Sequence, residues 1–279
     1  MVQFTILLLY LSLEGLHQTI KKKQLLLGAF LISLAIGIKL SPIVLIPYLL
    51  YRNYVKSALL VIVLCGFYFY LPNIILGYSE GQQLWSDWWS LIEPKTKEQI
   101  FDMNNRKNHG ISTLLSTLFL KDITDNVVHL SNRRYLIGLS EETVQLLIYS
   151  IRALLASFTL YFLRSKPFKP QPDPLSQLWE LSYLFLVIPL FFPQQRIYNF
   201  IFLLPGITYL IFQLWFNATN VSKLRLKQVL FIIAILVLNM ELVLGAFRKF
   251  FWHYKTITYA TILLLFLLTC IKPKQLTKD

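Results

Sequence analysis

One apolar stretch, GAFLISLAIGIKLSPIVLIPYLLYR at residues 28–52, constrains the fold more than any other part of the sequence. Before its final Arg52 it contains a single charged residue, Lys39, and Pro42 follows shortly after. An ammonium group deep in a membrane segment costs free energy unless it faces a polar cavity or meets an anion. We therefore predict a membrane hairpin here, with Lys39 near its tip as a functional residue.

Composition places the whole chain in the membrane. Hydrophobic residues make up 56% of it, and several apolar runs approach the ~20 residues that a helix needs to cross a bilayer. The net charge of +13 does not indicate nucleic-acid binding, because the polar segments are too short for a separate domain. We expect an all-α, polytopic transmembrane helical bundle that forms a single membrane domain over residues 1–279, with the membrane and its lipids as partners.

The apolar runs predict about nine membrane segments. They lie at roughly 2–18, 24–38, 41–51, 57–77, 143–163, 176–192, 197–215, 228–246 and 256–271. Because Lys21, Lys22 and Lys23 precede the hairpin and Arg52 and Lys56 follow it, the positive-inside rule places both of its ends in the cytoplasm. This topology leaves one long extracytoplasmic loop, at about residues 78–142.

The long loop has the composition of a functional segment. It contains Trp85, Trp88 and Trp89 beside Asp87, and the run ISTLLSTLF after Gly110 predicts an amphipathic helix. Two readings of the tryptophans remain open. They belong to an aromatic belt at the membrane surface, or they form a surface that stacks on sugars or guides lipids.

Basic residues also occur in the two short loops that this topology places outside. Arg196 lies in the first, and Arg248, Lys249, His253 and Lys255 lie in the second. The positive-inside rule disfavours cations there, and an anionic ligand such as a lipid phosphate accounts for them. Together with Lys39 they are candidates to bind one phosphate; the alternative is that they extend to lipid headgroups.

Several classes of site have no sequence signal. There is no nucleotide-binding glycine loop, no GxSxG and no HExxH, and Cys65 and Cys270 both fall inside apolar runs. We expect neither a cofactor nor a metal ion.

Three segments resemble glycosyltransferase family 87, a group of GT-C enzymes similar in plan to polyprenol-phosphate-mannose-dependent mannosyltransferases. The pattern GxxLxxLAxxIKxxPxxxxPYLLYR at residues 28–52 resembles the family's hairpin. Asn108-His109-Gly110 before ISTLL resembles a loop motif that the family writes Asn-Gln-Ser, and residues 188–205 resemble a later stretch. Gly110 in place of Ser, and Tyr198-Asn199 in place of His-Tyr, depart from those motifs.

The resemblance implies a membrane hexosyltransferase of the cell envelope, in the bacterial inner (plasma) membrane. It would transfer a mannose-like hexose from a polyprenyl-phosphate sugar to an extracytoplasmic glycan or lipid acceptor. Lys39, Arg196 and the 248–255 cations would then hold the donor phosphate. Asn108, His109, Trp88 and Trp89 would lie near the acceptor.

The resemblance also implies a missing part. The family's catalytic base is an Asp in the first outer loop, whereas this chain opens with MVQFTILLLYLSL, which resembles an internal helix of the family. We therefore expect a truncated or split member, possessing no activity when alone unless Asp87 or Asp102 supplies the base. The alternatives are a lipid-linked oligosaccharide polymerase or ligase, and a non-catalytic lipid-binding or transport protein.

Overall fold

The computed structural model describes residues 2–92, 100–101, 107–120, 135–163, 167–217 and 221–273. Every secondary-structure element named within these residues is a helix. Five helical segments are long and apolar enough to cross a membrane, and shorter apolar helices accompany them at residues 4–20, 25–38, 41–51 and 256–270. The expected all-α polytopic class is confirmed, whereas the number of membrane crossings stays a prediction.

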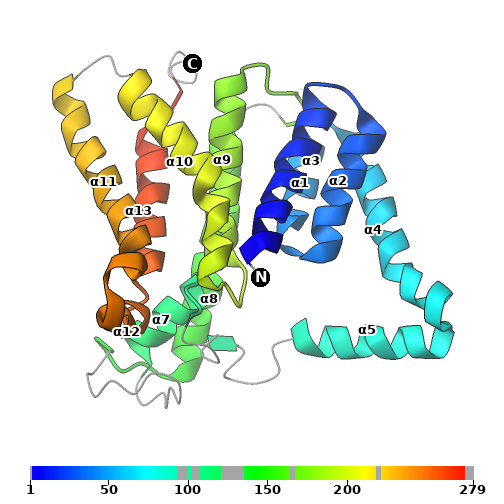
Figure 1. The fold of residues 1–279 in the computed structure, drawn as a ribbon, viewed down its shortest axis with the longest axis horizontal. Helices are drawn as coiled ribbons and strands as arrows, with labels where there is room; N and C mark the ends of the chain where they lie inside the picture. The colour runs from blue at the N-terminus through cyan, green and yellow to red at the C-terminus, as the bar shows by residue number, and fades with distance from the viewer. Residues whose placement is uncertain are drawn as a thin grey trace. The chain divides into compact units, whose positions relative to one another are not determined.

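The described chain divides into two compact units. The first contains Met1–Thr96 and Ser165–Pro172. Its helices are α1 (Val2–Ile20), α2 (Leu25–Ile38), η1 (Ser41–Val44), α3 (Leu45–Tyr51), α4 (Val55–Leu76) and α5 (Tyr78–Ile92), and α1 lies beside α2 (Figure 1).

Two glycines allow α1 and α2 to approach closely. A Cβ atom on Gly28 would lie 2.2 Å from Oγ1 of Thr19 and 2.8 Å from the carbonyl oxygen of Gly15. A Cβ atom on Gly15 would lie 2.6 Å from Cγ1 of Ile32. Small residues serve the same purpose in membrane helix pairs generally, because association there depends on close backbone packing. The first residue of the 28–52 stretch is thus a packing residue.

The helical run of this stretch is interrupted at Lys39. The residue has an extended backbone with φ −153° and ψ 131°, and its amide still donates to the carbonyl of Ala35. Pro42 then lies in the first turn of η1, where the missing amide hydrogen costs no helical hydrogen bond. The Lys39 side chain is half-buried.

Arg52, at the end of the stretch, is completely buried in the first unit rather than exposed as a flanking cation. Its guanidinium donates to the carbonyl of Lys169 at 3.5 Å, and the amide of Phe168 donates to the carbonyl of Tyr51 at 2.8 Å. These two bonds join the end of α3 to residues 167–172.

The second unit contains Lys97–Arg164 and Asp173–Asp279. Its longer helices are α8 (Glu141–Leu163), α9 (Pro174–Phe191), α11 (Val221–Val243) and α13 (Thr256–Cys270). The shorter ones are α7 (Ile111–Phe119), η2 (Ile197–Leu203), α10 (Leu204–Ile211), η3 (Phe212–Phe216), η4 (Gly245–Phe247) and α12 (Arg248–His253).

Helix α9 forms the centre of this unit. In its candidate span 78% of the residues are buried, against 17% in α8 and 11% in the span of α11. The ring of Phe162 stacks on Trp179 and Tyr183, with centroid distances of 4.4 and 4.0 Å. The indole of Trp179 also donates to the carbonyl of Leu268 in α13 at 2.9 Å. Helices α8 and α11 therefore leave broad apolar faces for lipid.

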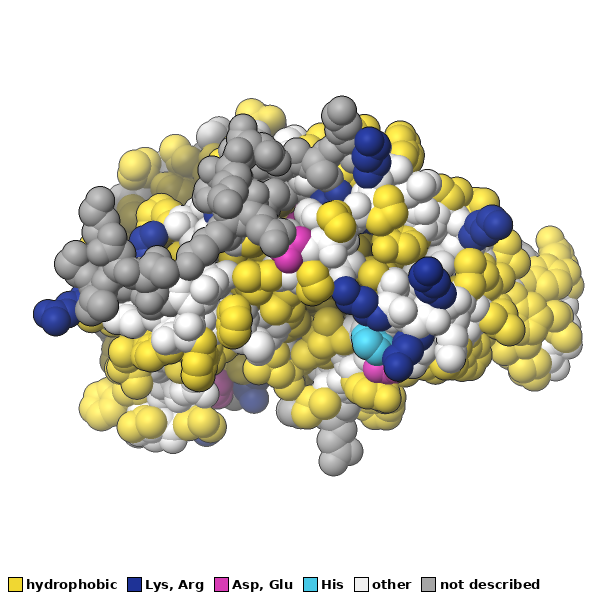
Figure 2. All heavy atoms as spheres, turned by 90° about the horizontal axis from the view of Figure 1, so that it is seen from above, with side chains coloured by type: hydrophobic (Ala, Val, Ile, Leu, Met, Phe, Trp, Pro, Cys, Tyr) yellow, Lys and Arg dark blue, Asp and Glu magenta, His cyan; other side chains and the backbone are white. Residues whose placement is uncertain are grey.

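The exposed hydrophobic side chains are those expected of a membrane protein. Large hydrophobic side chains are exposed along several helices, among them Ile75 in α4 (69%), Leu146 in α8 (67%) and Leu242 in α11 (85%). Soluble monomers rarely expose contiguous apolar surface on this scale. Figure 2 shows hydrophobic side chains over much of the surface drawn, with Lys and Arg side chains scattered among them.

Candidate functional site

Three segments that are far apart in the sequence meet in the second unit. Asn108 and Arg196 form an isolated antiparallel bridge, and the amide of His109 donates to the carbonyl of Gln195 at 2.8 Å. Oγ1 of Thr258, in the first turn of α13, donates to the carbonyl of His109. In Figure 1, α7 and α12 lie at the same end of this unit. We call this meeting point of residues 107–110, 195–196 and 252–258 the polar junction.

The imidazole of His109 lies inside the polar junction. The residue is 0% exposed, and neither ring nitrogen has a hydrogen-bond partner among the described residues. Burial lowers the pKa of His109 well below its usual value, and the charge of Lys255 contributes a smaller lowering. The ring is therefore neutral near pH 7, with one nitrogen able to accept and the other able to donate a hydrogen bond.

Lys255 connects α12 to α13 in an uncommon conformation. Its φ of +53° places it in the left-handed region, and its side chain is 1% exposed. A non-glycine residue held in this region indicates that the surrounding structure imposes the conformation, and such positions concentrate at functional sites. The carbonyl of Lys255 accepts the amide of Thr258 at 3.0 Å, so the lysine is coupled to the contact with His109.

Trp252 is a second buried feature of the polar junction. Its side chain is 3% exposed, and two cations lie against its ring. Nζ of Lys107 is 5.2 Å and Cζ of Arg248 is 5.3 Å from the ring centroid, both within cation–π range. Lys107 and Arg248 are themselves exposed. The indole thus holds two solvent-accessible positive charges beside the junction.

Helix α7 begins directly after Gly110 and supports the polar junction. Its residues 111–117 are all buried, and it packs in an apolar cluster with Val144 and Ile148 of α8. Two of its hydroxyls bond within the helix: Oγ of Ser116 donates to the carbonyl of Ser112 at 2.8 Å, and Oγ1 of Thr117 donates to the carbonyl of Thr113 at 2.7 Å. The helix is therefore enclosed by protein on both faces.

Arg152 is a residue that the sequence analysis missed. It lies within the candidate span α8, and Nη2 donates to Oγ of Ser112 in α7 at 2.7 Å. The signal was available, because Arg152 is the only charged residue in the run 143–163. A charge inside a membrane helix is a functional candidate by default. Here it links the candidate span α8 to the helix that follows Asn108 and His109.

The predicted site residues fall into three groups. The polar junction or the adjoining α12 contains Asn108, His109, Arg196, Arg248, Lys249, His253 and Lys255. The first unit contains Lys39, Asp87, Trp88 and Trp89, and Asp87 is exposed on α5. Asp102 lies outside the described residues. Within those residues no cluster of three His, Cys, Asp or Glu side chains is arranged to hold a metal ion.

The sequence model of glycosyltransferase family 87 matches residues 1–189, well over half of the chain. The chain belongs to glycosyltransferase family 87. It is accordingly a multi-pass protein of a family of membrane glycosyltransferases. No curated protein and no solved structure matches it. The family 87 match includes Lys39, Asn108 and His109, but it ends before Arg196 and Lys255. The association of these later cations with the Asn108-His109 segment therefore rests on the structure.

Proposed function

We propose that this family 87 protein transfers a mannose-like hexose from a polyprenyl-phosphate donor to a glycan or lipid acceptor outside the cytoplasm, in a bacterial inner membrane. The observation that carries the proposal is the polar junction. It brings the Asn108-His109 segment of the family match to Arg196, Lys255 and α12, which contributes Arg248 and Lys249.

A phosphate leaving group develops negative charge as the sugar departs, so cations near it lower the barrier. The proposed donor-phosphate ligands in the second unit are Arg196, Arg248, Lys249, His253 and Lys255. Lys39, in the family hairpin of the first unit, is proposed separately as a phosphate-binding residue. Burial strengthens such contacts, because water competes less for the charges. Lys255 and His253, each 1% exposed, meet that condition.

The acceptor hydroxyl must lose a proton during transfer, and a carboxylate suits that role. Asp87 and Asp102 are the proposed bases. The neutral imidazole of His109 and the amide of Asn108 are proposed to hydrogen-bond acceptor hydroxyls. The low pKa of His109 favours this binding role over a role as base, because a weakly basic imidazole takes up a proton poorly.

The donor-phosphate assignment is tested by comparing two lipids, undecaprenyl phosphate and uncharged undecaprenol, bound to the full chain in nanodiscs. The difference between their binding free energies measures the contribution of the phosphate group. We expect Lys39→Ala and Arg248→Ala each to reduce this difference by about 1.5–3 kcal/mol, the worth of a hydrogen bond to a charged group.

Lys56→Ala is the matched control, because Lys56 is an exposed cation outside the proposed site. It should leave both affinities unchanged. If Lys39→Ala and Arg248→Ala bind undecaprenyl phosphate as tightly as the wild type does, the phosphate site is not where we place it. Transfer of labelled mannose to membrane acceptors, lost in Asp87→Asn or Asp102→Asn, would identify the base.

A further inference from the structure

Helix α5 presents a row of aromatic and polar side chains along one face. Gln82, Trp85, Ser86, Trp89 and Ser90 line a hollow on its surface. Their spacing of three and four residues places them on the same side of an α-helix. We call these five residues the α5 face.

The α5 face is built on a firm support within the first unit. Gly81 packs so closely on Asn73 of α4 that a Cβ atom would lie 2.7 Å from the Asn73 Cα. The indole of Trp85 donates to the carbonyl of Phe69 at 2.8 Å, and its ring meets the Phe69 ring edge-on at 4.8 Å. Trp88 packs on the same two rings, at 5.2 Å from Trp85 and 5.9 Å from Phe69.

Trp89 differs from these two tryptophans. It is 60% exposed, and the only ring contact it makes among the described residues is a tilted one with Trp88 at 6.4 Å. The polar members of the face, Gln82, Ser86 and Ser90, are exposed beside it. An accessible indole surrounded by hydroxyl and amide groups combines a flat apolar surface with hydrogen-bond donors and acceptors.

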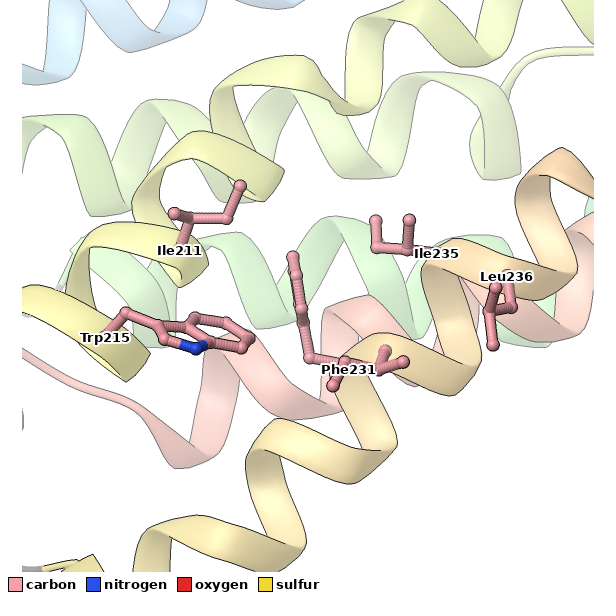
Figure 3. Close-up of a pocket in the computed structure, with 6 residues that line it drawn as sticks. Ile211, Trp215, Phe231, Ile235 and Leu236 are labelled. Carbon is pink, nitrogen blue, oxygen red and sulfur yellow. The ribbon is translucent and has the colours of Figure 1, made fainter.

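A second hollow, in the other unit, has a different lining and serves as a comparison. Ile211 and Trp215 line it from α10 and η3, and Phe231, Ile235 and Leu236 line it from α11 (Figure 3). All of its lining side chains are apolar apart from the indole nitrogen, which suits acyl chains. The α5 face instead pairs its aromatic rings with three polar side chains, which acyl chains would leave without hydrogen bonds.

We propose that the α5 face binds a glycan, with a pyranose ring stacked on Trp89 and its hydroxyls hydrogen-bonded by Gln82, Ser86 and Ser90. The apolar C–H face of a hexose matches the indole, and the equatorial hydroxyls match the amide and hydroxyl groups around it. The binding itself is independent of the proposed function. Only the assignment of this glycan as the acceptor of the transferase rests on it.

The test measures binding of mannotriose to the full chain in nanodiscs by saturation-transfer NMR. We expect Trp89→Ala to weaken binding about fivefold or more, because it removes the flat apolar surface on which the sugar ring stacks. Trp89→Phe should retain most of the affinity, and Gln82→Ala should weaken it. Leu84→Ala is the matched control, because Leu84 is 48% exposed on the same helix but does not line the hollow.

A membrane-surface role for Trp89 gives the opposite pattern. In nanodiscs made with brominated phosphatidylcholine, lipid contact would quench more fluorescence in the wild type than in Trp89→Phe, and mannotriose would not bind. That result would overturn the proposal. Undecaprenyl phosphate binding, measured on the same samples, reports separately on the donor site, so failure of one proposal is distinguishable from failure of the other.

Discussion

Substitution of Gly28 by Ala tests the packing that supports the family hairpin. Alanine is the better helix former, and in a helix interior the exchange of Gly for Ala is worth about 0.5–1 kcal/mol. The new methyl carbon, however, would lie 2.2 Å from Oγ1 of Thr19, 2.8 Å from the carbonyl oxygen of Gly15 and 2.9 Å from the amide nitrogen of Thr19. Two of these atoms belong to the backbone of α1, so the helices must move apart.

Gly66 in α4 provides the matched control. A Cβ atom built there has no neighbour within 4 Å, so Gly66→Ala gains helix propensity without a clash. Overpacking of this kind costs about 1–3 kcal/mol. The difference between the two variants isolates that cost, because the propensity gain is common to both. We expect Gly66→Ala to be slightly more stable than the wild type and Gly28→Ala to be about 1–3 kcal/mol less stable than Gly66→Ala.

The assay is unfolding in mixed micelles of a mild detergent and SDS, followed by circular dichroism, with the free energy of unfolding extrapolated to zero SDS. Binding of undecaprenyl phosphate to Gly28→Ala reports whether displacement of α2 also disturbs Lys39 at its end. Equal stability of Gly28→Ala and Gly66→Ala would refute the reasoning, because it would mean that α1 and α2 do not approach at Gly15 and Gly28.

Two further predictions concern the second unit. Arg152→Ala should lower the free energy of unfolding by about 1.5–3 kcal/mol, because the guanidinium bond to Ser112 is lost. In the double variant, adding Ser112→Ala to Arg152→Ala should lower the free energy of unfolding little further. If the losses of the two single variants add up fully in the double variant, the pairing is contradicted. The lowered pKa of His109 predicts that acidification below 6.5 destabilises the fold, because the unfolded chain takes up a proton that the folded chain, with Lys255 nearby, refuses. The free energy of unfolding, measured from pH 7.5 to 5, should therefore fall less steeply with acidification in His109→Asn than in the wild type. The two slopes should differ by up to about 1.4 kcal/mol per pH unit. Identical slopes would count against a buried neutral imidazole.

Much of the helical architecture is predictable from the sequence, because apolar length is a local property. The run 143–163 coincides with α8, and 256–271 with α13, since each run must satisfy its backbone hydrogen bonds internally in lipid. The break at Lys39 and Pro42 is local in the same way. The family follows from short motifs that lie mostly within residues 1–189.

The burial of individual cations is not predictable by this route. Arg52 and Lys255 both stand beside apolar runs, where the sequence indicates charges at a membrane boundary, yet they are 0% and 1% exposed. Their burial depends on carbonyls, rings and helix ends contributed by distant segments, such as Lys169 for Arg52. No local pattern encodes that environment.

The sequence by itself determined the class of the protein, the extents of its apolar helices and its relation to family 87, since hydropathy and short motifs act over a few turns of chain. Only the tertiary structure decided that His109 meets Gln195 and Thr258, that Arg152 bonds to Ser112, and that Lys107 lies against the ring of Trp252. These contacts join residues that are tens of positions apart or more, and they form because α7, α8, α9 and α13 pack around a shared apolar core. The amino-acid type fixes the chemistry of a side chain, whereas its neighbours depend on how the whole unit buries its hydrophobic surface.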